Sequence, residues 1–184
     1  SHKALRQILM ARESMGRFEF KVIYQFIQNA VNAQNEWSKR NYPMEREKVR
    51  NAWLFGIAYR AKNELTLAEE NLSKALNLCR QINLVEFEAG ILLDLARLRY
   101  AQGDFKDAQE KASEALMITE RSGYVLQGAD VNLLLAQYAL EKEKDKVKAK
   151  EYAESALKLA YCDGPPYYYK VAYEEAERML EKLK

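Results

Sequence analysis

Residues 68–78 read AEENLSKALNL, residues 108–118 read AQEKASEALMI and residues 149–159 read AKEYAESALKL. The first alanines of these stretches lie 40 and then 41 residues apart, and a second alanine follows each one seven residues later, at Ala75, Ala115 and Ala156. A spacing of seven is about two helical turns, so the two alanines of each stretch share one helix face. Small side chains on that face let a neighbouring helix approach closely. The sequence therefore predicts three copies of one helical repeat.

A second helix is expected upstream of each copy. Each of these helices carries a small residue at the same repeat position, within AWLFGIAYRA (52–61), LLDLARLRYA (92–101) and NLLLAQYALE (132–141). These small residues are Gly56, Ala96 and Ala136, and they lie 40 residues apart. The apolar content of the three segments indicates helices that are packed between other helices rather than lying on the surface.

Short turns join the two helices of each copy, at Asn63-Glu64, Gly103-Asp104 and Lys144-Asp145, and the third copy carries one extra residue. After the second helices, Asn83, Gly123 and Gly164 recur at the same repeat position. Asn and Gly tolerate the left-handed backbone conformation that ends many helices. Pro165 and Pro166 are expected to start the next helix, where a missing N–H costs little.

The flanks extend this pattern. The first 48 residues read as a degenerate helix pair, with helices over 3–14 and 18–40, and residues 167–184 read as an amphipathic capping helix. The expected fold is all-α: a right-handed α–α superhelix, or solenoid, of about nine helices in antiparallel pairs. A single array over 1–184 would divide into a first pair at 1–48, repeats at 49–84, 85–124 and 125–164, and a cap at 165–184.

Over residues 49–159 the chain resembles the tetratricopeptide repeat family. That family places a small residue in the first helix, a Gly-Asp-like turn, and two alanines seven apart in the second helix. The matching residues are Gly56, Ala68 and Ala75; Ala96, Gly103, Asp104, Ala108 and Ala115; and Ala136, Ala149 and Ala156. The period is near 40 rather than the family's 34, and Asn83 and Gly123 replace the usual closing proline.

Long-period arrays of this kind are similar to those of bacterial regulators, peptide-pheromone receptors and kinesin light chains. Residues 161–167, YCDGPPY, are similar to the ends of repeat arrays in bacterial signalling ATPases of the STAND type. The resemblance implies a scaffold that binds other proteins. Because the chain opens Ser1-His2 without a Met, we expect a trimmed tag or an excised fragment. The resemblance implies that such a fragment would be the sensor or regulatory part of a larger protein.

Composition and charge exclude several other classes. The 29 Lys+Arg against 27 Asp+Glu leave a net charge of +2, which favours neither disorder nor nucleic acid as a partner. The basic-looking run EKEKDKVKAK (141–150) alternates in sign and reads as a solvated turn and helix start. No run of about 18 apolar residues is present, so no membrane partner is expected.

Catalytic and metal-binding residue types are scarce. His2 is the only histidine, and Cys79 and Cys162 stand far apart, so zinc sites made of Cys and His and nucleophile–histidine pairs are both excluded. No phosphate-binding GxxxxGK[ST] or GxGxxG motif occurs. We therefore expect no enzyme, no cofactor and no metal. Two isolated thiols favour a cytoplasmic location.

In a stacked helix-pair solenoid, the first helix of each pair lines the concave surface. If Gly56, Ala96 and Ala136 pack against the second helices, positions around them face outward into a groove. The expected groove residues are Arg50, Trp53, Ile57, Arg60, Asp94, Arg97, Tyr100, Asp130 and Gln137, whereas Leu93, Leu133 and Leu140 are interpreted as packing sideways. This mixture of aromatic and charged side chains is typical of protein-contact surfaces.

Two hypotheses follow. The first is a non-enzymatic scaffold that binds a peptide or protein segment in the groove. Its site would differ from family members that hold a C-terminal carboxylate with Lys and Asn, because the matching positions carry Trp53 and Ile57, Leu93 and Arg97, and Leu133 and Gln137. The alternative is a self-associating module that forms a homodimer through its end face or its aromatic C-terminal helix.

Overall fold

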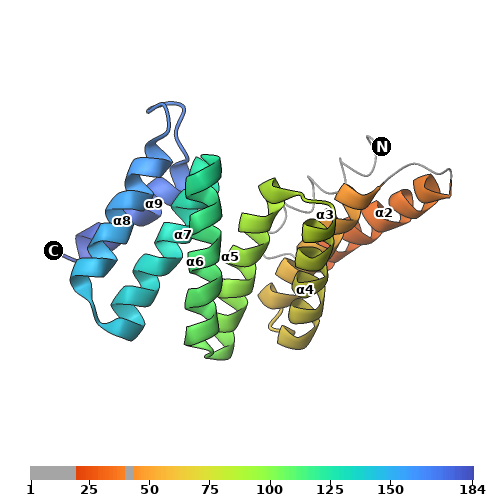
Figure 1. Ribbon diagram of the computed structural model, residues 1–184, viewed down its shortest axis with the longest axis horizontal. Helices are drawn as coiled ribbons and strands as arrows, with labels where there is room; N and C mark the ends of the chain where they lie inside the picture. Colours follow the sequence, from red (N-terminus) through yellow and green to blue (C-terminus); the bar gives the residue numbers. More distant parts are fainter. Residues whose placement is uncertain (1–19, 40–43) are drawn as a thin grey trace. The chain divides into compact units, whose positions relative to one another are not determined.

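The structure is a computed structural model that describes residues 20–39 and 44–184, and these residues form eight α-helices and one π-helical turn, with no strand among them (Figure 1). The elements are α2 (Phe20–Ser38), α3 (Glu45–Ala61), α4 (Leu65–Gln81), α5 (Val85–Gln102), α6 (Phe105–Ser122), α7 (Val125–Tyr138), the π-helical turn η1 (Ala139–Glu143), α8 (Lys146–Tyr161) and α9 (Lys170–Lys182). The all-α prediction is confirmed. The helix expected over 3–14 lies outside the described residues.

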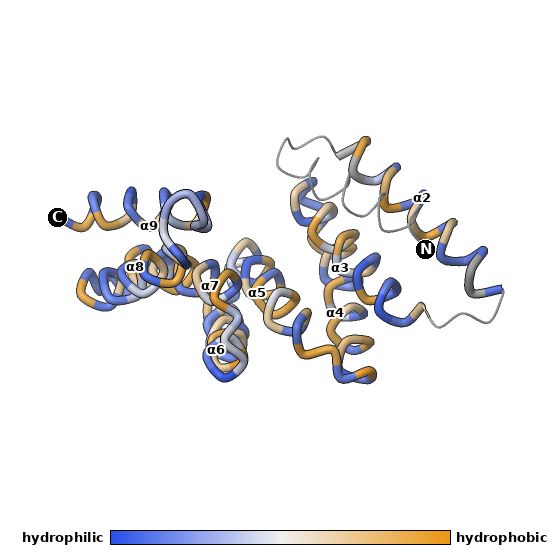
Figure 2. Tube along the Cα trace, turned by 90° about the horizontal axis from the view of Figure 1, so that it is seen from above, coloured by the Kyte–Doolittle hydropathy of each residue, from blue (hydrophilic) through white to orange (hydrophobic). Residues whose placement is uncertain are grey.

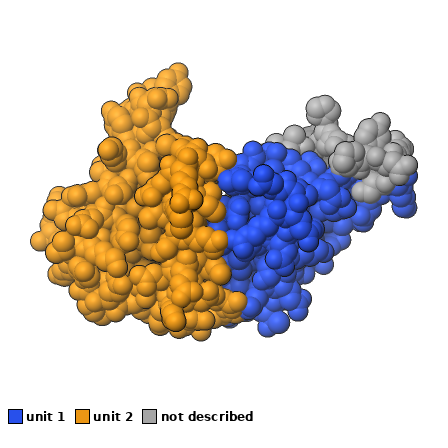
Figure 3. All heavy atoms as spheres, in the orientation of Figure 1, with its two compact units in different colours: residues 1–98 blue, residues 99–184 orange. Residues whose placement is uncertain are grey.

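The chain divides into two compact units, residues 1–98 and 99–184, so that the boundary falls within α5 (Figure 3). In the first unit α2 packs on α3 and α3 on α4; in the second α6 packs on α7, α7 on α8 and α8 on α9. This packing of consecutive helices is the arrangement that the repeats predict. The repeat boundaries at 84/85 and 124/125 and the superhelical path stay predictions.

The repeated small residues lie where helices meet. The paired alanines of α4, α6 and α8 are all at most 3% exposed: Ala68, Ala75, Ala108, Ala115, Ala149 and Ala156. Gly56 lies so close to α4 that an added Cβ would stand 2.5 Å from Cγ of Leu72, which is itself fully buried. The prediction that Gly56 contacts the second helix is therefore confirmed. Hydrophilic and hydrophobic residues alternate along the helices, as amphipathic packing requires (Figure 2).

The turns after each pair use the left-handed backbone region, as the sequence predicts, and the turns within the pairs use it as well. The φ angles are 63° at Asn63, 83° at Gly103 and 58° at Lys144 inside the pairs, and 53° at Asn83, 68° at Gly123 and 78° at Gly164 after them. The Asp that follows two of these turns caps the next helix. Asp104 accepts a hydrogen bond from the backbone N–H of Asp107 at 3.2 Å, and Asp145 accepts one from Lys148 at 2.9 Å.

The extra residue of the third copy is absorbed by the π-helical turn η1. In the first two copies, the residue after the turn donates its backbone N–H to a carbonyl five residues earlier. Glu64 donates to Tyr59, and Asp104 donates to Arg99. In the third copy the corresponding N–H, that of Asp145, reaches six residues back to Ala139 at 3.0 Å. One added residue thus widens the last turn of α7 instead of shifting the start of α8 out of register.

The C-terminal helix begins later than expected. α9 starts at Lys170, and the stretch before it is a loop in which the N–H of Tyr167 bonds to Gly164 at 2.7 Å and that of Tyr169 bonds to Ala160 at 2.8 Å. These bonds turn the chain back onto the end of α8. The expectation that Pro165 and Pro166 open the helix is therefore wrong, since both lie in the loop.

The cysteines differ in their surroundings. Cys79 is fully buried on α4, whereas Cys162 is exposed just after α8, and neither is in a disulfide. Packing in the helical core thus explains a cysteine at position 79 but not at position 162. None of the helices described over 20–39 and 44–184 combines the length and the apolar character that a bilayer-spanning segment needs.

Candidate functional site

A side-chain hydrogen bond links Trp53 on α3 to Asp94 on α5, within the first unit. The indole Nε1 donates a hydrogen bond to Oδ2 of Asp94 at 2.7 Å. Oδ1 of the same carboxylate accepts a hydrogen bond from Nη1 of Arg97 at 3.2 Å and lies 3.6 Å from Nη2 of Arg60. We call these four residues the Trp53 cluster. Asp94 is only 5% exposed, so these donors supply the partners that a buried carboxylate needs.

Charge is unevenly matched within the Trp53 cluster. One carboxylate faces two guanidinium groups, and the Arg60 side chain is 27% exposed. Burial lowers the pKa of Arg60, while the attraction of Asp94 acts in the opposite direction. Nε of Arg60 is buried and has no hydrogen-bond acceptor in the structure. Asp94 is therefore shared by two arginines, and one buried donor of Arg60 is left without an acceptor.

The position of the Trp53 ring depends on a glycine. A Cβ added to Gly90 on α5 would lie 2.5 Å from Cη2 of the indole, so only a residue without a side chain lets the ring rest on the helix backbone there. The centroid of the Phe87 ring lies 5.8 Å from that of Trp53. The guanidinium carbons of Arg46 and Arg50 each lie 4.9 Å from the Phe87 centroid, a cation–π distance.

The structure brings four of the predicted groove residues together as the Trp53 cluster, and places Arg50 beside it over Phe87. Asp94 lies beneath the other three instead of facing outward. Ile57 is half-buried on α3. Sequence reasoning missed Arg46, Phe87 and Gly90. A usable signal was present for Gly90, because a glycine inside a helix often marks a close contact.

In the second unit, Tyr100 and Gln137 meet through a residue of η1. The Tyr100 hydroxyl donates a hydrogen bond to one carboxylate oxygen of Glu141, and Nε2 of Gln137 donates to the other at 3.1 Å. The bond from Tyr100 lowers the pKa of Glu141. Burial and the same bond raise the pKa of Tyr100 well above its usual range. Lys142 Nζ lies 4.0 Å from the centroid of the Phe105 ring.

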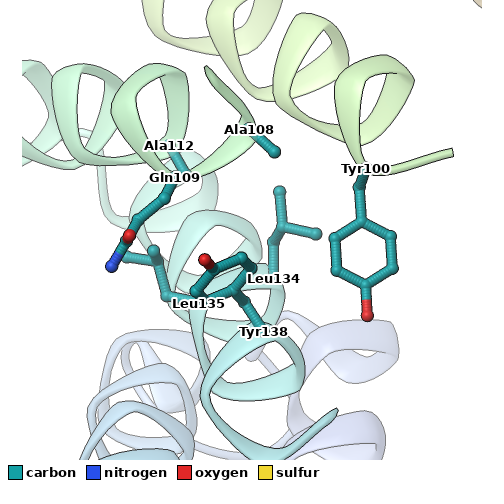
Figure 4. A pocket seen from close by; sticks show the side chains of 7 residues that line it. All are labelled: Tyr100, Ala108, Gln109, Ala112, Leu134, Leu135 and Tyr138. Carbon is teal, nitrogen blue, oxygen red and sulfur yellow. The ribbon is translucent and has the colours of Figure 1, made fainter. Parts of the chain in front are cut away.

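A small hollow lies next to Tyr100, and its lining side chains converge from the end of α5, from α6 and from α7 (Figure 4). They are Tyr100, Ala108, Gln109, Ala112, Leu134, Leu135 and Tyr138. None of them is charged. The hollow is a gap beside the small residues of α6, and it offers no group that would fix a ligand.

Asp130 lies apart from the other predicted residues of its unit. Its Oδ2 accepts a hydrogen bond from the hydroxyl of Tyr169 at 3.3 Å, next to the start of α9. The second unit thus places two of its predicted residues together and the third near the C-terminal helix. Over the described parts of the chain, no group of three or more His, Cys, Asp or Glu residues is arranged to hold a metal ion.

Comparison with known proteins supports the fold. No protein-family model matches the chain, and no curated protein matches it. Among solved structures the chain is similar to BtubC (BKLC) from P. vanneervenii, with a TM-score of 0.59 over 98% of this chain and 89% of that one. Sequence identity between the two is 18%, so the similarity shows a shared helical fold and nothing finer.

Proposed function

We propose that the chain is a protein-interaction module that binds a segment of another protein across α3 and α5, at the Trp53 cluster, and catalyses no reaction. The observation that carries this proposal is the meeting of Trp53, Arg60 and Arg97 over one buried carboxylate. Trp and Arg are the residue types that contribute most to binding energy at protein interfaces. Asp94 holds the three side chains in place before a partner arrives, which lowers the entropy cost of binding.

The fold supports the same role. Helical-repeat proteins present successive first helices as an extended binding surface, and the resemblance to tetratricopeptide arrays points in that direction. We propose on the same grounds that the module is the regulatory part of a larger cytoplasmic protein. The near-zero net charge of +2 gives no support for nucleic acid as the partner.

A random-peptide library displayed on phage would test this proposal. We expect peptides enriched on the wild-type protein to lose binding to the double variant Trp53→Ala/Arg97→Glu, because it removes the ring and reverses one charge. The matched control is Arg121→Glu, an exposed arginine of α6 in the other unit. Circular dichroism and melting curves establish that each variant is folded. Enriched peptides that bind the double variant as well as the wild type would place the site elsewhere.

A specific observation also favours self-association as a second candidate function. Large side chains are exposed at the end of α8 and around the start of α9: Tyr161 at 50%, Tyr167 at 75% and Val171 at 65%. Such surfaces are common at protein interfaces. Sedimentation of the wild type and of Tyr167→Ser/Val171→Ser tests this. A dimer that the double variant dissociates would support the idea, and a monomer at every concentration would remove it.

A further inference from the structure

We propose that two buried amides, Gln34 on α2 and Asn51 on α3, fix the register in which α2 packs along α3. Nδ2 of Asn51 donates a hydrogen bond to Oε1 of Gln34, and Nε2 of Gln34 donates one to the backbone carbonyl of Met44 at 3.2 Å. Gln34 and Asn51 are each 4% exposed. None of the three residues belongs to the Trp53 cluster, so this inference is independent of the proposed function.

The repeat shows that packing at this position does not require an amide. Ile91 and Val131 follow Asn51 at successive 40-residue steps, so they occupy the same position of α5 and α7. Both are fully buried. The first copy thus has a polar group where the later copies have an apolar one, and hydrogen bonds must replace the water that this group loses.

That replacement is incomplete. Oδ1 of Asn51 is buried and has no hydrogen-bond partner. A buried acceptor without a donor lowers stability, so the amide pair is a poor source of stability. Buried polar groups are best known for selecting one of several similar helix arrangements, as a single asparagine does in coiled coils. Selection therefore explains Asn51 better than stability does.

Asn132 on α7 shows how a buried amide behaves when it selects nothing. It is 5% exposed, and its Nδ2 donates a hydrogen bond to the carbonyl of Gly128 at 2.8 Å, one turn earlier in the same helix. This bond forms wherever α7 packs. The bond between Gln34 and Asn51 crosses from one helix to another, so it forms only when α2 holds one position along α3.

α2 and α3 pack antiparallel, and their apolar contacts do not define a single register. The apolar residues of α3 that contact α2 come in pairs one helical turn apart: Leu54 and Ala58, which pack with Ile27 and Ala30, and Phe55 and Tyr59, which both lie near Tyr24. A slide of α2 by one turn, about 5 Å, would exchange the members of each pair and keep apolar groups in contact.

The amide at position 51 distinguishes these registers. Ala30 lies four residues before Gln34 and is fully buried. A slide that brought Ala30 opposite Asn51 would break the bond between the two amides, whereas it would suit an apolar residue at position 51. The connecting segment adds little constraint, since residues 39–44 link α2 to α3, whereas the shorter segment 82–84 links α4 to α5.

Double electron–electron resonance, which measures the distance between two nitroxide labels, tests the proposal. The labels are attached to Val22→Cys on α2 and Glu45→Cys on α3, two exposed positions, in a Cys162→Ser background. Because the helices are antiparallel, these positions lie toward opposite ends of the pair, and a slide of one turn changes their separation by about 5 Å. We expect a single distance when both amides are present.

Gln34→Met/Asn51→Leu removes both amides at nearly constant side-chain volume. We expect this variant to melt as a folded protein, with a second distance, displaced by about 5 Å, in at least about a tenth of the molecules. The matched control is Gln25→Met/Asn29→Leu. It makes the same two changes at an exposed amide pair of α2, whose hydrogen bond measures 3.1 Å, and should keep the single distance.

Exchange of the two amides separates the bond from the side-chain volume. Gln34→Asn/Asn51→Gln keeps one amide on each helix, so the single distance should return. A single unshifted distance in Gln34→Met/Asn51→Leu would overturn the proposal. Failure of that apolar variant to fold would overturn it too, because the amides would then supply stability instead of selection. An exchange variant with as much of the second distance as the apolar variant would also contradict it.

Discussion

The indole nitrogen of Trp53 donates a hydrogen bond to the buried carboxylate of Asp94 across 2.7 Å, and this bond joins residues 41 positions apart in the chain. It links the first helices of two neighbouring repeats inside one compact unit. The bond makes Trp53, the central side chain of the proposed site, part of the packing of its unit, so stability and the proposed binding can be measured at the same residues.

A double-mutant cycle measures the energy of this bond. Trp53→Phe removes the donor and keeps most of the ring, and Asp94→Ala removes the acceptor. We expect each single variant to lower the free energy of unfolding by about 1–3 kcal/mol, with a coupling of about 1 kcal/mol. Urea denaturation of the four proteins gives these values. Additive effects would show that the bond contributes nothing of its own.

Gly90→Ala tests the close contact beneath the indole. The new methyl group would overlap Cη2 of Trp53, so we expect the ring to move and its bond to Asp94 to break. A net loss of about 1 kcal/mol should follow, since strain of about 1–3 kcal/mol exceeds the gain in helix propensity of about 1 kcal/mol. The indole N–H resonance that Trp53→Phe removes should also shift.

Gly128→Ala is the matched control for this prediction. Gly128 also lies inside a first helix, but the nearest atom to an added Cβ is Cδ1 of Leu159 at 3.2 Å, the end of a flexible side chain. Its stability should stay the same or rise. Equal destabilisation of both variants would show that any added side chain in these helices is unfavourable.

Equivalent turns with different residues provide a second test. Gly103 and Lys144 occupy the same turn position in two copies, and both have positive φ angles, 83° and 58°. A lysine pays a conformational penalty there that glycine avoids. We expect Lys144→Gly to raise the free energy of unfolding by about 0.5–1 kcal/mol and Gly103→Lys to lower it by about 1–2 kcal/mol. Thermal denaturation measures both; a destabilised Lys144→Gly would contradict the argument.

The bond between Tyr100 and Glu141 predicts a pH dependence. Because the pKa of Glu141 is lowered in the folded protein, the ionised form adds stability above its unfolded pKa, and this is lost as the pH falls through the folded value. Tyr100→Phe removes the main cause, so the pKa of Glu141 should rise toward 4.5.

Carboxyl NMR titration measures that pKa directly. The fall in Tm between about pH 7 and about pH 3 should also be smaller in Tyr100→Phe than in the wild type. Tyr161→Phe, at an exposed tyrosine that makes no hydrogen bond to Glu141, is the control and should leave the Glu141 titration unchanged. An unshifted Glu141 in Tyr100→Phe would show that the bond is absent in solution.

The two thiols should react at different rates. Burial raises the pKa of Cys79 to about 11, and its Sγ donates a hydrogen bond to the carbonyl of Leu84 at 3.0 Å. Cys162 is exposed. We expect iodoacetamide to modify Cys162 rapidly in the native protein and Cys79 only when it unfolds, since the thiolate is the reactive form. Mass spectrometry of timed samples follows both sites, and equal rates would contradict this.

The helical architecture was predictable from sequence because its determinants are local and repeated. Alanines seven apart, a small residue such as Gly56, and Asn or Gly at positive φ act within one or two helices, so periodicity reveals them. The start of α9 was misplaced because it depends on the return of Tyr169 to Ala160, a bond between chain segments that no helical period encodes.

The candidate site was predictable only in part. The outward positions of the first helices selected Trp53, Arg60 and Arg97, which the structure brings together around Asp94, since the 40-residue period places equivalent turns side by side. The burial of Asp94 was not predictable, because it depends on donors that reach it from α3, those of Trp53 and Arg60. Phe87 and Arg46 lie near the starts of their helices. The groove residues were selected by their distance from Gly56 and Ala96 in the middle of these helices, and that criterion does not reach the helix ends.

The π-helical turn has a consequence for how such a chain varies over evolutionary time. An insertion inside a helix would normally rotate everything after it by about 100° and destroy its contacts. Here the widened turn of Ala139–Glu143 absorbs the insertion at the joint between two helices, and the buried faces of α7 and α8 remain matched. At this joint, repeat length in the sequence is therefore decoupled from packing geometry, and the third copy carries its extra residue without a rebuilt core.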